Sequence, residues 1–286
     1  MRYSAARLNT NTSSLIVIIG LLFMVLTWPV WRWLWQEWLG NQYYSHGLLI
    51  PVVSAFLIVQ RVRNDPTFVW RNGQNNPLSL ALLVISMLAF LYTLNTKAYY
   101  LSAFAMLFML ASLVWIAGGW SALRKLAFPI LYLGFMAPLP FVEKSTLPLA
   151  MFTGVCSTGL VQLLGLQVHI VGNAVTLPNA DLVIGAQCSG INSLIALTAL
   201  TTLSAYLVQG PFWRRALLIL SAIPLALLGN IMRVSSLLFV ARSYGAESAF
   251  TFYHDYSGAL FFVAALILLY ALALLLRCTT LRVDVI

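Results

Sequence analysis

Three short stretches of the chain combine reactive residue types with small or polar neighbours: CSGI at 188–191, NIMR at 230–233 and HDYSG at 254–258. A thiol becomes a competent nucleophile when a helix N-terminus or a cation lowers its pKa, and we expect Cys188 to open an apolar helix. His254 can act as a general base and later protonate a leaving amine. The permanently charged Arg233 can hold a tetrahedral oxyanion or clamp a substrate carbonyl. Together, these side chains predict acyl-transfer chemistry of the kind that cleaves or transfers a peptide.

Each of these residues also has a structural alternative. A buried Cys188 can be an inert small hydrophobe, Arg233 can extend its stem to the membrane surface, and His254 can be an interfacial residue. His46 and His169 are rival bases, although both are more remote from the motifs than His254. An arginine inside an apolar run nevertheless favours a functional site.

Three further residues are expected to support the site. Asn230 lies three positions before Arg233, on the same helical face, so it can orient Arg233 or satisfy a contact between helices. Ser189 follows the cysteine directly. Asp255 is a candidate for orienting His254, although adjacent residues in a helix do not face each other.

Composition indicates a membrane protein. Hydrophobic residues make up 61% of the 286 residues and charged residues only 8%, against roughly 25% charged in soluble domains. The net charge of +9 is scattered between apolar runs, which is typical of topology signals and argues against nucleic-acid binding. The cysteines form neither a disulfide framework nor a metal-ligand spacing, so we expect no metal and no cofactor.

The helices that must position the site follow from apolar runs of about 20 residues, which cross a hydrocarbon core. Eight are predicted, at roughly 14–34, 45–60, 78–95, 98–117, 124–139, 190–209, 214–241 and 256–277. The weaker run 146–165 predicts an interfacial helix. The alternating segment 167–187, with its Gly172-Asn173 turn, predicts a small extracytoplasmic β-hairpin before Cys188. We therefore expect one all-α, multi-pass membrane domain over residues 1–286.

Basic residues set the orientation, because cytoplasmic loops hold their excess. Placing Arg2 and Arg7 inside puts nearly every later basic cluster inside as well, provided that 146–165 does not span. Both termini are then cytoplasmic and Cys188 faces outward. Arg233 lies 19 residues after Arg214, which is about 28 Å along a helix and places it near the outer boundary.

The order of the three motifs resembles the exosortase/archaeosortase family of membrane cysteine proteases or transpeptidases. YYSHGLLIP at 43–51 and APLP at 137–140 resemble it more loosely. The resemblance implies a Cys188–Arg233–His254 catalytic set in the cytoplasmic membrane. It also implies exported substrates with a C-terminal sorting tail, which consists of a motif, a transmembrane helix and a basic cluster.

Two other functions stay open from the residues alone. One is a polytopic transporter or lipid-binding scaffold in which Arg233 and Asn230 line a substrate path. The other is a membrane acyltransferase that uses His254 and does not need Cys188. Dependence on the Cys188 thiol distinguishes the resemblance from both.

The predicted topology is testable with reporter fusions along the chain. Because of the basic clusters, fusions should report a cytoplasmic location after Gly73, Trp120, Gly210 and Arg282. Fusions should report an outer location after Gly172 and Gly245. A cytoplasmic signal at Gly172 would contradict the topology, since Cys188 would then be separated from exported substrates.

Overall fold

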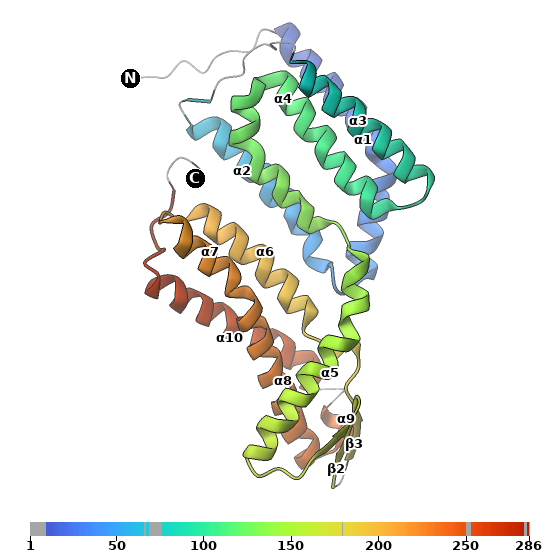
Figure 1. The fold of residues 1–286 in the computed structure, drawn as a ribbon, viewed down its shortest axis with the longest axis vertical. Coiled ribbons are helices and arrows are strands. Elements are labelled where there is room, and N and C mark those ends of the chain that lie inside the picture. The colour runs from blue at the N-terminus through green and yellow to red at the C-terminus, as the bar shows by residue number, and fades with distance from the viewer. Residues whose placement is uncertain are drawn as a thin grey trace.

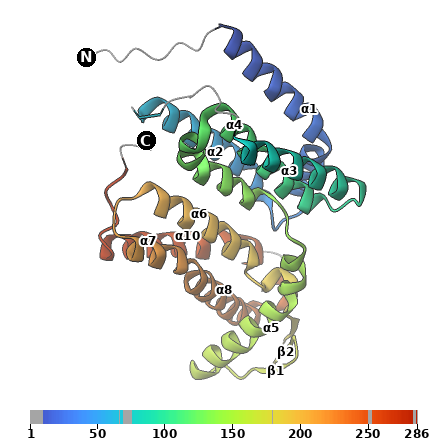
Figure 2. The same cartoon turned by 45° about the horizontal axis from the view of Figure 1, so that its top comes forward.

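The computed structural model describes residues 10–65, 67–68, 76–178, 180–249, 253–282 and 285, and it is mostly helical. Its helices are α1 (Thr10–Gly40), η1 (Ser45–Leu48), α2 (Leu49–Asn64), α3 (Pro77–Asn95), α4 (Tyr99–Tyr132), η2 (Leu133–Met136), α5 (Pro140–Leu163), η3 (Ala186–Cys188), α6 (Ile191–Leu207), α7 (Phe212–Leu220), α8 (Ala222–Tyr244), α9 (Ala246–Ser248) and α10 (His254–Leu275). The helices of the N-terminal half lie on one side in Figures 1 and 2, and α6, α7, α8 and α10 lie on the other.

Eight helical stretches of the described residues are long and apolar enough to cross a membrane, which confirms the predicted multi-pass class. They are Ile18–Gly40, Ser45–Asn64, Pro77–Asn95, Tyr99–Met136, Pro140–Leu163, Ala186–Leu207, Phe212–Tyr244 and Tyr256–Leu275. This set of candidate spans differs from the predicted set in two helices. α4 joins two predicted spans, and α5 corresponds to the predicted interfacial helix.

The helix α4 folds back on itself. Gly119 has φ 72° and ψ −179° inside it, a conformation that glycine adopts readily and other residues do not. The Tyr99 ring stacks on Trp33 (centroids 5.7 Å apart), and the Trp38 indole donates to the Met136 carbonyl (2.9 Å). Both ends of this 38-residue stretch therefore meet the last turns of α1. The chain reverses at Gly119, as the bend in α4 shows in Figure 1, and the predicted spans 98–117 and 124–139 correspond to its two arms.

The predicted interfacial helix 146–165 corresponds to α5, which begins six residues earlier, at Pro140. Proline suits the first turn of a helix because its missing N–H would have no partner there. α5 lies beside α8 (Figure 1), and the Ser157 hydroxyl donates to the Ile231 carbonyl of α8 at 3.0 Å. α5 thus has the length of a span and packs lengthwise on the helix that carries Arg233.

The predicted hairpin at 167–187 contains a third strand. β1 (His169–Val171), β2 (Ala174–Leu177) and β3 (Ala180–Val183) form an antiparallel sheet in the order β1-β2-β3. The buried face of this sheet includes Val175, Leu177 and Leu182, and it packs with residues of α5 and α8. This sheet delivers the chain from α5 to Cys188.

We call the end of the helical bundle at which α1 stops the site end. There the buried Tyr44 phenol accepts a hydrogen bond from the Leu139 amide (2.9 Å), which joins the segment after α1 to the start of α5. Burial raises the pKa of Tyr44, and the Leu139 amide acts in the opposite direction. The phenol therefore stays neutral at physiological pH.

An ion pair marks the opposite end of the bundle. Lys125, in the second arm of α4, lies 3.0 Å from the Asp65 carboxylate at the end of α2. Burial acts to raise the pKa of Asp65, but hydrogen bonds from Thr67 and Lys125 hold it below its usual value. The carboxylate is therefore ionised at neutral pH and joins α2 to α4.

Candidate active site

Cys188 is buried, with 2% of its surface exposed. It ends the short helix η3, and its backbone N–H donates to the Gly185 carbonyl (2.9 Å). Residues of α5, the sheet and α8 cover it. We expected Cys188 to face the outer aqueous boundary, but in this structure it is buried in one cluster with residues of α5, the sheet and α8. α6 begins only at Ile191, so Cys188 precedes the helix by three positions and does not open it.

Asn230 holds the Cys188 segment in place. Its side chain is 4% exposed, and its amide donates to the Cys188 carbonyl (2.8 Å) and to the Thr153 hydroxyl (3.2 Å). Since Thr153 belongs to α5, this one amide joins α5, η3 and α8. We expected Asn230 either to orient Arg233 or to satisfy a contact between helices. The hydrogen bonds show the contact between helices.

Gly190 makes that contact sterically feasible. Its φ of +71° is a left-handed conformation, and a Cβ added there would lie 2.7 Å from the Asn230 Cβ. Ser189, also buried, accepts a weak hydrogen bond from the Ile191 amide (3.4 Å) at the start of α6. The close approach of Gly190 to Asn230 was not predicted, although a glycine directly before a helix was a visible signal.

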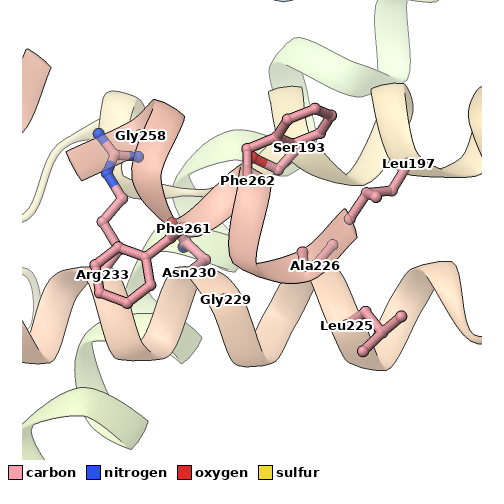
Figure 3. Close-up of a pocket in the computed structure, with 11 residues that line it drawn as sticks. Ser193, Leu197, Leu225, Ala226, Gly229, Asn230, Arg233, Gly258, Phe261 and Phe262 are labelled. Atoms are coloured by element: carbon pink, nitrogen blue, oxygen red, sulfur yellow. The ribbon is translucent and has the colours of Figure 1, made fainter. Parts of the chain in front are cut away.

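Arg233 reaches from α8 to the first turn of α10. Its Nε donates to the buried Ser257 hydroxyl (3.3 Å), and the guanidinium carbon lies 3.9 Å from a Cβ added at Gly258. Figure 3 shows the arginine extending toward Gly258, beside a small hollow where α6, α8 and α10 meet. Ser257 and Gly258 belong to the HDYSG motif, so the second and third motifs are in contact.

The side chains of His254 and Asp255 lie outside the described residues. The backbone places residue 254 at the start of α10, one turn before Ser257 and Gly258. Positions 254, 257 and 258 therefore share a helical face. The role of His254 stays a prediction.

A cleft of about 380 Å³ opens at the site end, next to Arg233. Its lining comes from the segment after α1 and from η3, α6, α8 and α10: Gln42, Tyr43, Ser45, His46, Gln187, Asn192, Ser193, Ala196, Arg233, Gly258, Ala259 and Phe262. The exposed Gln187 lines it, whereas the next residue in the chain, Cys188, is buried and does not. His46 lines the cleft, whereas the exposed His169 of β1 does not, so His46 is the stronger of the two rival bases. The sequence did not reveal this order.

The Gly190–Asn230 contact predicts a difference between two glycine substitutions. Gly190→Ala and Gly172→Ala both place alanine at a positive φ, which costs about 1–2 kcal/mol. Only Gly190 has a neighbour, since nothing lies within 4 Å of a Cβ at Gly172. Displacing Asn230 should cost about 1–3 kcal/mol more.

Denaturant unfolding of the two variants in detergent measures this difference. Equal losses of unfolding free energy in both variants would show that Asn230 and Gly190 do not depend on each other.

Comparison with known proteins gives one match. The family model for transmembrane exosortase (Exosortase_EpsH) matches residues 35–271. Comparisons with curated proteins and with solved structures found no match. The matched region includes Cys188, Arg233 and the cleft, and it covers most of the chain. The chain belongs to the transmembrane exosortase family.

Proposed function

We propose that this protein cleaves C-terminal sorting tails of exported proteins at the outer face of the cytoplasmic membrane, with Cys188 as the nucleophile. Membership of the exosortase family implies a sorting-tail processing enzyme, and exosortases are generally cysteine transpeptidases. Family membership likewise implies substrates that carry C-terminal sorting signals. The catalytic residues and the side of the membrane are our own assignments.

The observation that carries these assignments is that the three motifs meet beside one cleft. Asn230 bonds the carbonyl of Cys188, and Arg233 bonds Ser257 of the third motif. The order of motifs along the chain thus becomes a spatial cluster at the site end.

The proposed reaction begins when the Cys188 thiolate attacks the scissile carbonyl carbon and forms a C–S bond. Arg233 donates hydrogen bonds to the oxyanion that develops. His254 takes the thiol proton and returns it to the leaving amine, so the C–N bond breaks and a thioester forms. Water or another nucleophile then releases the processed protein from Cys188.

The buried thiol must become accessible before it can react. Glycines flank its turn on both sides, at Gly185 and Gly190, and short segments with such residues commonly absorb local rearrangements. The exposed Gln187 already lines the cleft. We therefore propose that substrate binding rotates the Cys188 side chain to the cleft while its carbonyl stays bonded to Asn230.

The proposed orientation places the site end outside and the Asp65–Lys125 end inside, with both termini cytoplasmic. In this orientation α5 lies at the outer surface, and one stripe of it faces lipid. Phe141, Phe152, Val155 and Leu163 lie on one helical face and are 51–87% exposed. Such a face suits contact with lipid.

The transporter or scaffold alternative receives less support. It requires Asn230 to line a substrate path. Asn230 does border the small hollow beside Arg233, but its two amide N–H groups are committed to the Cys188 carbonyl and the Thr153 hydroxyl. Neither N–H group is therefore free for a transported solute.

The proposed nucleophile is tested by comparing Cys188→Ala with Cys156→Ala at equal expression. Cys156, a partly exposed thiol of α5, is the matched control. Cys188→Ala should abolish processing of a tailed substrate, because no other group supplies the thioester, whereas Cys156→Ala should process normally. Immunoblots of the substrate report its length. Full processing by the Cys188 variant would leave the protease without its nucleophile and favour the transporter or scaffold alternative.

A further inference from the structure

The segment Tyr44–Gly47 contains an imidazole that the proposed reaction does not use. Its neighbours have structural roles: Tyr44 anchors the segment to the Leu139 amide, and Gly47 leaves room for Trp38. A Cβ at Gly47 would lie 2.5 Å from Trp38 Cδ1. Tyr44 and Gly47 thus fix η1 against the bundle, and they hold His46, which lies between them, in a defined position.

His46 lacks an equivalent structural role. Its ring stacks on Tyr44 (centroids 6.0 Å apart, planes at 29°) and lines the same cleft as Arg233. Its Nε2 atom is buried without a hydrogen-bond partner among the described residues. Buried polar atoms are nearly always hydrogen-bonded, so this nitrogen calls for a partner, which is either a water molecule or a ligand.

The chemistry of the cleft indicates what that partner is. Besides Arg233, the polar residues that the structure describes in its lining are uncharged and include Gln42, Gln187 and Asn192. Neutral amides, hydroxyls and imidazoles match the N–H and C=O groups of a polypeptide backbone. A volume of about 380 Å³ falls in the range of sites that hold a small ligand or a short peptide segment.

We propose that His46 is a substrate-contacting residue whose imidazole hydrogen-bonds the backbone of the sorting tail in the cleft. It approaches the tail from η1, while Arg233 approaches from α8. This inference rests on the proposed function, since it assumes that the tail enters this cleft. It assigns a binding role to the N-terminal half of the chain, whereas the proposed catalytic residues all lie in the C-terminal half.

Two substitutions at this position separate hydrogen bonding from packing. His46→Phe keeps an aromatic ring against Tyr44 and removes both nitrogens, whereas His46→Gln keeps a donor and an acceptor. Loss of a neutral hydrogen bond should slow tail processing roughly five- to tenfold in His46→Phe, with most of the rate retained in His46→Gln.

The matched control is His169→Phe, which removes an exposed imidazole on β1 that does not line the cleft. It should process the tail at the wild-type rate. A wild-type rate in His46→Phe would overturn the inference. So would equal losses in His46→Phe and His46→Gln together with lowered thermal stability, because that pattern indicates packing.

A direct contact measurement separates this inference from the proposed function. Benzoylphenylalanine is placed at position 46 or, as a control, at position 169 of the full-length Cys188→Ala protein, which is co-expressed with a tailed substrate. Irradiation should crosslink the tail to position 46 and not to position 169.

The two ideas fail in different ways in this experiment. If position 46 does not crosslink while wild-type protein processes the tail, the His46 contact is wrong and the proposed function stands. If position 46 crosslinks the tail but wild-type protein never processes it, the proposed function is wrong and the contact stands.

Discussion

The site depends most on the buried amide of Asn230. A buried amide without partners would cost about 1–3 kcal/mol, and this amide meets its requirement by bonding the Cys188 carbonyl and the Thr153 hydroxyl. These two hydrogen bonds hold α5, η3 and α8 together at Asn230. Arg233 lies one turn further along α8, so the bonds that fix Asn230 also fix the base of the arginine that lines the cleft.

In a membrane, hydrogen bonds and small residues largely determine which helices pack together. Lipid tails are as apolar as leucine, so the burial of leucine alone does not select which helices associate. The contact between α8 and α10 uses two glycines: a Cβ at Gly229 would lie 3.6 Å from the Phe261 carbonyl oxygen, and Gly258 lies next to the Arg233 guanidinium. Close approach and a few hydrogen bonds therefore define the arrangement around Arg233.

Hydropathy predicted the membrane class and the approximate spans, including the two arms of α4 as separate spans. It could not place the reversal between these arms at Gly119, because that depends on the backbone angles of this residue. Nor could the sequence reveal the burial of Cys188, which lies in one packed cluster with residues of α5, the sheet and α8. Periodicity describes one element at a time, whereas these features arise where distant elements meet.

The candidate site residues also divide into those that the sequence indicated and those whose importance only the structure shows. Cys188 and Arg233 stood out because reactive groups are unusual within apolar runs. Gly190 was visible only as part of the CSGI motif and His46 only as a rival base. The importance of Gly190 depends on Asn230, 40 positions away, and that of His46 depends on sharing a cleft with Arg233. The spatial arrangement thus adds a steric requirement at Gly190 and places His46 in the cleft.

The central claim is that Cys188 forms a covalent thioester with the processed substrate. The most direct measurement is mass spectrometry of the protein purified during turnover of a tailed substrate. A substrate acyl group should appear on the peptide that contains Cys188, and hydroxylamine should release it. Complete processing with an unmodified Cys188, or an acyl group on Cys156 in its place, would contradict this account.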